Sequence, residues 1–134
     1  MESKLNSTVD IEIGGEMRKI KFTIGAVEEL EAMLPEKNLF LLMRKGLWSV
    51  SEIVSATYCG LKVFDRKLTK PTVEKWIAEY TKENDITTLR LYVFAALGLS
   101  GCVGKEKSAF IDVLNALRED AENEGEQEEQ DLGK

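Results

Sequence analysis

The chain has 134 residues, of which 43% are hydrophobic and 31% are charged, and this is the balance of one globular domain. It contains no histidine, and its two cysteines, Cys59 and Cys102, are too few and too distant for a metal-ligand motif or a disulfide framework, so we expect no enzyme, metal site or cofactor. The net charge is −6, and Lys and Arg do not cluster with aromatic residues, which argues against nucleic-acid binding.

The first predicted element is a β-hairpin, because apolar and charged residues alternate on both sides of two glycines. A two-residue turn at Gly14-Gly15 places Ile13 opposite Glu16 and Val9 opposite Ile20. The glycines lack the spacing of a dinucleotide or phosphate-binding loop. We therefore interpret them as a hairpin turn.

Three basic residues, Arg18, Lys19 and Lys21, lie on the second predicted strand. Two interpretations remain open. The residues contact an acidic partner, such as the tail of a neighbouring subunit, or they form the solvent face of the hairpin, where charge discourages edge-to-edge aggregation. We include all three as candidate partner-binding residues.

The next predicted elements are two helices. From Ala26 the apolar period becomes helical, and Pro35 ends this helix. Asn38 is a suitable N-cap for the short segment LFLLMRK, and Gly46 is a candidate left-handed residue that closes it.

Two further helices are predicted from their start signals. Ser49 and Glu52 have the spacing of a capping box, and the helix that they open is expected to reach about Cys59, with Gly60 as its C-cap. Thr69 is expected to open the following helix, which has an apolar stripe and a charged, solvated face.

Asp85 is the predicted N-cap of the most apolar segment, residues 86–101, ITTLRLYVFAALGLSG. The segment is too short for a bilayer, and Arg90 interrupts it, so we do not expect a membrane span. Because it has almost no polar face, we expect it to be the central helix of the domain.

A last helix is predicted from about Lys107, and the domain is expected to cover residues 1–118. Residues 119–134 hold eight acids and one lysine, so we expect an acidic disordered tail. The predicted fold class is therefore α+β, mainly helical, with an N-terminal β-hairpin followed by about five or six helices. The N-terminal residues lack the apolar segment of a signal peptide, so we expect a cytoplasmic protein.

Protein binding is the activity that the composition favours, because the segment LFLLMRKGLW adds apolar surface to a small domain. The candidate residues in the segment are Leu39, Phe40, Leu42, Met43, Leu47 and Trp48.

The succession VDIEIGGEMRKIKFTIGAVEELEAML and LFLLMRKGLWSVSEIVSATYCGLK resembles the tail assembly chaperones of long-tailed bacteriophages and of gene transfer agents. In that family two strands joined by Gly-Gly precede an Ala-x-x-x-Leu-Glu helix, matched here by Ala26, Leu30 and Glu31. A later capped helix closes on Gly-Leu, here Gly60-Leu61, and KLTKPTVEKWI is similar to a further family helix. The resemblance covers residues 9 to about 80, and residues 86–118 depart from the shorter members.

The resemblance implies a non-enzymatic chaperone that shields the tape measure protein in the bacterial host cytoplasm until tail tube protein replaces it. It also implies a homo-oligomer, a frameshifted longer form and absence from the mature virion. On this basis we expect the hairpin and the segment LFLLMRKGLW to form subunit or client surfaces. Two alternatives remain: a structural virion component, such as a tail completion or connector protein, and a small acidic regulator that binds one host protein.

Overall fold

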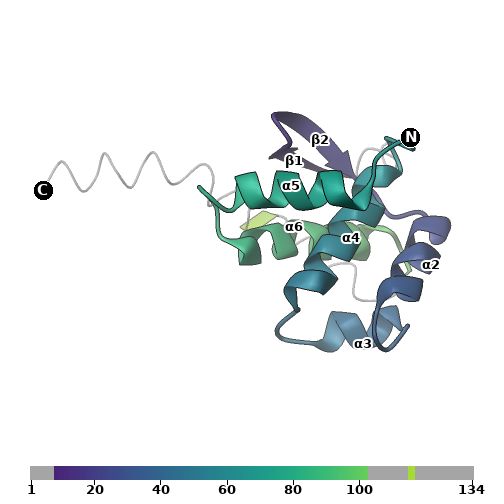
Figure 1. Cartoon of the computed structure of the whole chain (residues 1–134). Helices are drawn as coiled ribbons and strands as arrows, with labels where there is room; N and C mark the ends of the chain where they lie inside the picture. Colours follow the sequence, from purple (N-terminus) through teal and green to yellow (C-terminus); the bar gives the residue numbers. More distant parts are fainter. Residues whose placement is uncertain (1–7, 103–114, 117–134) are drawn as a thin grey trace, which may run out of the picture.

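The computed structural model describes residues 8–102 and 115–116. In this part of the chain a two-stranded antiparallel hairpin is followed by five helices, as shown in Figure 1, which confirms the predicted α+β class. The elements are β1 (Val9–Ile13), β2 (Glu16–Ile20), α2 (Ile24–Met33), α3 (Leu39–Arg44), α4 (Val50–Lys62), α5 (Lys70–Tyr80) and α6 (Ile86–Leu99). The predicted acidic tail lies outside the described residues, as does the last predicted helix apart from residues 115–116, which are helical.

The hairpin has the predicted register, with Val9 opposite Ile20 and Ile13 opposite Glu16. Gly14 and Gly15 both have positive φ values, 66° and 83°, which glycine adopts without the steric penalty of a side chain. One side of the hairpin is buried against the helices. A two-residue turn therefore sets the pairing that brings the alternating apolar residues into the core.

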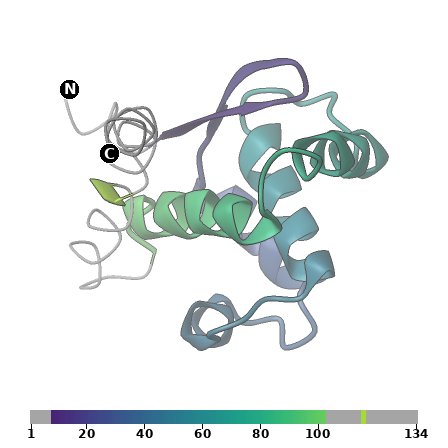
Figure 2. The same cartoon turned by 90° about the vertical axis from the view of Figure 1, so that its left-hand side faces the viewer.

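α4 is the element around which the others assemble, since it packs against α2, α5, α6 and β2 (Figures 1 and 2). The prediction that Gly60 caps this helix is wrong, because α4 continues to Lys62. A Cβ at Gly60 would lie 2.6 Å from Cγ2 of Ile20 and 2.9 Å from the ring of Phe22. Gly60 thus allows the hairpin to approach the helix, and its carbonyl accepts a hydrogen bond from the Lys21 N–H at 3.1 Å.

The predicted N-caps are confirmed at Asn38, Ser49, Thr69 and Asp85, whose side chains accept backbone N–H groups of the helices that they open. The prediction that Gly46 closes α3 in a left-handed conformation is wrong. The C-cap of α3 is Lys45 in an extended conformation, and its carbonyl accepts a hydrogen bond from Arg90 on α6. A side chain that is remote in sequence therefore hydrogen-bonds the backbone carbonyl at the C-cap of α3.

α6 is covered by the rest of the chain, as predicted for a helix without a polar face. Leu89, Val93 and Leu97 are fully buried, and the helix packs against α4 and β1. No helix in the described part of the chain is long and apolar enough to cross a bilayer.

Candidate protein-binding surface

Three of the predicted binding residues, Leu39, Leu42 and Trp48, belong to the core, with exposed fractions of 1%, 0% and 8%. Leu39 and Leu42 are three positions apart, so they point from the same inward face of α3. The indole N–H of Trp48 donates to the Leu42 carbonyl at 3.1 Å. These residues anchor α3 to the domain. They are core residues, and the prediction that they form an exposed contact surface is wrong.

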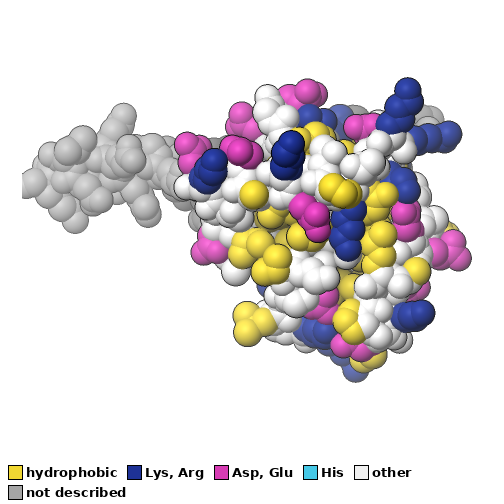
Figure 3. Space-filling model, in the orientation of Figure 1, with side chains coloured by type: hydrophobic (Ala, Val, Ile, Leu, Met, Phe, Trp, Pro, Cys, Tyr) yellow, Lys and Arg dark blue, Asp and Glu magenta, His cyan; other side chains and the backbone are white. Residues whose placement is uncertain are grey.

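The outward side of the same segment is apolar. Phe40, Leu41, Leu47 and Val50 are 57%, 44%, 84% and 61% exposed, and we call these four residues the α3 surface. They make up half of the exposed large hydrophobic side chains among the described residues. Figure 3 shows hydrophobic side chains reaching the surface at this lower end of the molecule.

Phe40 and Leu47 were predicted as binding residues, whereas Leu41 and Val50 were missed. Leu41 follows Phe40 on a helix whose inward positions are already taken, and Val50 is the first residue of α4. Met43, another predicted binding residue, is half-buried against the core. A helix of six residues has too few turns for its sequence to show which side packs against the domain.

The α3 surface is held in place by an ionic cluster behind it. Lys45 contacts Glu36 at 3.0 Å and Glu52 at 2.5 Å, and the Ser49 N–H donates to Glu52 at 2.7 Å. Burial of Glu52 acts to raise its pKa, but the hydrogen bonds from Lys45 and Ser49 more than offset this, so the pKa lies below its ordinary value. Glu52 is therefore a buried carboxylate that joins the start of α4 to the end of α3.

Arg90 connects the central helix to the loop after α3. Its guanidinium donates to the Lys45 carbonyl at 3.2 Å and lies 5.2 Å from the centre of the Trp48 ring. It also lies 5.6 Å from the ring of Phe94. This contact therefore joins the loop that carries Leu47 to a largely buried helix.

The three basic candidates of the hairpin differ in their surroundings, although Arg18 and Lys19 both line one groove. Arg18 faces the helices, where it donates to the carbonyls of Ile13 and Gly14 and stacks 3.9 Å from the centre of the Trp76 ring. Lys19 lies on the opposite side of the strand, because successive strand residues alternate. Arg18 thus helps to fix the hairpin, and the binding roles of Arg18, Lys19 and Lys21 stay predictions.

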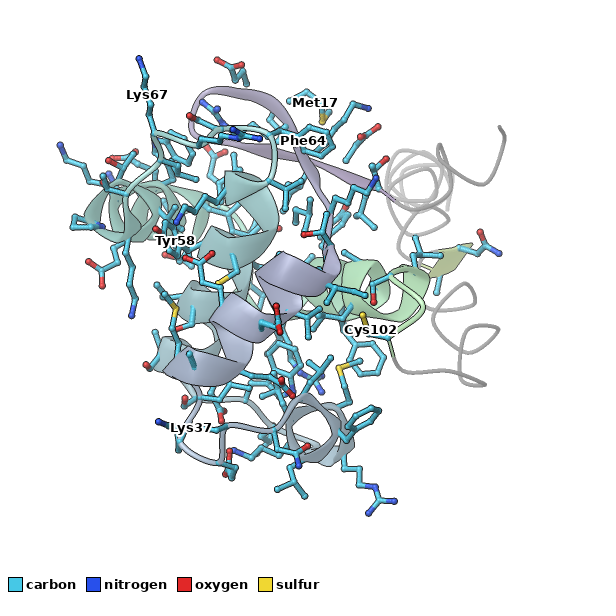
Figure 4. The ribbon with its side chains drawn as sticks, turned by 90° about the vertical axis from the view of Figure 1, so that its right-hand side faces the viewer. Met17, Lys37, Tyr58, Phe64, Lys67 and Cys102 are labelled. Carbon is cyan, nitrogen blue, oxygen red and sulfur yellow. The ribbon has the colours of Figure 1, made fainter. Side chains whose placement is uncertain are left out.

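A second feature was not predicted. A groove of about 290 Å³ lies between β2, the end of α4 with the loop that follows it, and the middle of α5, and we call it the hairpin groove. The exposed side chains of Met17 and Phe64 line it, and they lie close together in Figure 4. Since the two residues are far apart in sequence, no local pattern could indicate that they meet.

The described residues contain no group of three Cys, Asp or Glu side chains that could hold a metal ion. Cys59 is buried, and burial raises the pKa of its thiol to about 12, so the thiol is neutral at physiological pH. The chemistry of the described surface is that of apolar and ionic contacts.

Comparison with known proteins gives no family model, no curated protein and no solved structure that matches this chain.

Proposed function

We propose that the chain is a non-enzymatic binding protein that shields apolar segments of a client protein through the α3 surface. The observation that carries this proposal is the gathering of Phe40, Leu41, Leu47 and Val50 on one short segment. Isolated exposed hydrophobic residues are common on protein surfaces, but a gathering of this kind is typical of an interaction site.

The construction of the α3 surface suits a weak and repeated contact. Full burial of one large apolar side chain is worth roughly 1.5–3 kcal/mol, so four partly exposed residues supply a modest free energy before the cost of association is subtracted. Several copies along a long client would bind tightly through effective concentration while each copy remains easy to displace. This combination fits a transient coat better than a permanent complex.

The specific role that we propose is that of a phage tail assembly chaperone in the bacterial host cytoplasm. Its client would be the tape measure protein, and its partners would be further copies of itself, a frameshifted longer form and the tail tube protein that displaces it. The support is the sequence resemblance over residues 9–80, which correspond to β1 through α5. The exposed apolar segment that the resemblance singles out lies within this range.

The proposal is tested by producing the tape measure protein of the same genome with and without this chain, and measuring the soluble fraction of the tape measure protein. We expect the wild-type chain to raise that fraction. The double variant Phe40→Asp and Leu47→Asp should lose the effect, because it places charge on two of the most exposed apolar positions. Far-ultraviolet circular dichroism checks that the variant is folded.

The matched control is Ile24→Asp, which changes one exposed apolar residue at the start of α2 and should leave client binding intact. Full activity of the double variant would remove the α3 surface from the proposal. A wild-type chain with no effect on the client would contradict the chaperone role itself. Mass spectrometry of purified virions adds a second check, since a chaperone is absent from the particle and a structural component is present.

A further inference from the structure

β2 is an edge strand of the two-stranded sheet, and only part of its outer edge is occupied. The two-residue turn makes every second residue of β2, beginning with Glu16, exchange backbone hydrogen bonds with β1. The backbone groups of Met17, of Lys19 and of Lys21, which follows the strand, therefore point away from β1. The Lys21 N–H donates to the Gly60 carbonyl of α4 at 3.1 Å, which agrees with this direction. At Met17 and Lys19 the same edge has no backbone partner among residues 8–102 and 115–116.

The hairpin groove lies along this open edge. It is lined by four consecutive residues of β2, Glu16 to Lys19, whereas a pocket over one face of a strand would be lined by alternate residues. The opposite wall begins at Leu61, directly after the Gly60 whose carbonyl pairs with Lys21. The groove therefore occupies the place where a third strand would continue the sheet.

The groove has an apolar floor beneath this edge. Leu61 and Leu68 are buried, and Trp76 lines the same groove from α5, and we call these three residues the floor. The exposed side chains of Met17 and Phe64 stand at the rim, close together in Figure 4. An extended segment beside β2 would bury apolar side chains against these residues while its backbone pairs with the strand.

The charges that line the groove favour an uncharged occupant. The lining holds two carboxylates and two cations, namely Glu16, Asp65, Arg18 and Lys19. These charges balance, so a charged segment gains no net attraction. Lysine side chains often protect strand edges, but the Lys19 ammonium reaches across the hairpin to Asp10 at 3.3 Å and is thus turned toward β1. The open edge therefore lacks this protection.

We propose that the hairpin groove binds an extended, uncharged and apolar segment of another protein, which adds to β2 as a third strand. Met17 and Lys19 exchange backbone hydrogen bonds with the segment. The residue opposite Arg18 points to the same side of the sheet as Arg18, which is the side of the helices, so its side chain meets the floor. This inference does not rest on the proposed chaperone function, because it follows from strand pairing and the shape of the groove.

The opposite wall excludes a second copy of the hairpin as the occupant. Neighbouring strands lie about 4.8 Å apart, and Phe64 and Asp65 line the groove from the loop across from β2. A groove with β2 on one side and this loop on the other admits one extended segment. The hairpin of a second copy is two strands wide and does not fit.

The test begins with the free full chain, labelled with ¹⁵N. Amide hydrogen exchange should be fast at Met17 and Lys19 and slower at Arg18 and Ile20, whose N–H groups bond to β1. The chain is then titrated with a short capped peptide that has leucine at its centre, valine on each side and threonine at both ends. We expect the Met17 and Lys19 amide signals to move downfield as these groups gain hydrogen bonds, while the signals of α3 stay in place.

Two methylated peptides separate strand pairing from simple apolar contact. In the proposed pairing the N–H groups of both valines point to β2, and the N–H of the central leucine points away. Methylation of both valine nitrogens should therefore weaken binding by at least about tenfold, because it removes two hydrogen bonds. Methylation of the leucine nitrogen is the control and should largely preserve the affinity.

A matched pair of variants tests the strand edge from the protein side. Lys19→Pro removes an N–H that points away from β1, so the hairpin loses no hydrogen bond. It should weaken peptide binding by about tenfold, because one donor is lost from the edge. Lys19→Thr also removes the ammonium but keeps the N–H, so it should bind like the wild type. Unchanged amide signals of α5 check that both variants are folded.

Four outcomes would overturn the proposal. The peptide leaves the Met17 and Lys19 amide signals in place, or both methylated peptides bind equally well, which assigns the contact to apolar burial alone. Slow exchange of these two amides in the free chain shows that part of the same chain already takes the edge. A free chain that is dimeric as the wild type and monomeric as Lys19→Pro assigns the edge to a second copy.

Discussion

Gly60 is the residue at which the hairpin meets α4, and its missing side chain is a requirement of packing. A methyl group at this position would come closest to atoms of Ile20 and Phe22, both of which are core residues. Ile20 is fully buried, so neither neighbour can move aside without disturbing the interior. The hairpin would have to shift outward to admit even this small group.

The first prediction concerns this contact. Gly60→Ala should lower the free energy of unfolding by about 1–2 kcal/mol, because the added Cβ would lie only 2.6 Å from Ile20. So close a contact places the overpacking penalty at about 2–3 kcal/mol, which exceeds the gain of roughly 1 kcal/mol in helix propensity. Urea denaturation measures it. The control is Gly46→Ala, where a Cβ meets nothing within 4 Å and φ is not left-handed, so stability should stay equal or rise slightly. Equal stability of the Gly60 variant and wild type would contradict the packing account.

Glu52 gives a pH-dependent prediction. Its pKa in the folded state lies below the ordinary value of 4.5, so its ionised form stabilises the fold at neutral pH. That stability is present above pH 4.5 and is lost as the pH falls through the lowered pKa. Glu52→Gln should therefore cost about 1 kcal/mol at neutral pH, a value reduced because Lys45 is partly exposed to solvent.

Urea denaturation across the acid range checks this prediction. The stability gap between wild type and Glu52→Gln should narrow as the pH falls below 4.5. Glu79→Gln is the control, since Glu79 and its partner Lys82 are both exposed and the change should have little effect at any pH. A gap that stays constant with pH would show that Glu52 acts through packing instead of charge.

At the scale of elements, α3 has one apolar side turned inward and another turned outward. The inward residues fix the helix, and the Leu39 N–H donates a hydrogen bond to the Glu31 carboxylate at 2.8 Å. Arg90 holds the loop that follows. The α3 surface is thus held by contacts with α2, α4 and α6, because α3 itself has only six residues.

Arg90→Met should loosen this support without unfolding the domain. The change keeps most of the side-chain stem but removes the hydrogen bond to the Lys45 carbonyl and the contact of the guanidinium with Trp48. Native-state hydrogen exchange should accelerate at the Leu42 and Lys45 amides and stay unchanged at Val73 in α5.

The control for this experiment is Arg44→Met, in which the altered side chain is exposed on α3. It should leave exchange at the same amides close to that of the wild type. An equal acceleration at all amides in the Arg90 variant would indicate a global loss of stability and would contradict the local role.

Local signals predicted most elements, and long-range contacts decided the rest. The alternation of apolar and polar residues, the paired glycines and the polar N-cap residues are patterns among neighbouring residues. The hairpin register and four helix starts could therefore be predicted. The ends of α3 and α4 depend on Arg90 and on the hairpin, respectively, which are remote in sequence. The same limit applies to residues 39–48, because a six-residue helix shows too few turns to reveal its inward face.

At the scale of the whole molecule, exposed apolar residues lie at two separate places. The α3 surface lies at one end, and the hairpin groove, with exposed Met17 and Phe64, lies at the other, near β2 and α5 (Figure 1). A client bound at the α3 surface would therefore leave the hairpin groove open.

The central claim is that the α3 surface contacts a client directly, and site-specific photo-crosslinking tests it best. A benzoylphenylalanine residue placed at position 47, the most exposed apolar position of the described chain, should form a covalent adduct with co-expressed tape measure protein. The same group at position 24, which is also exposed but lies on α2, should form little or none. No adduct from position 47, or equal adducts from both positions, would contradict the account.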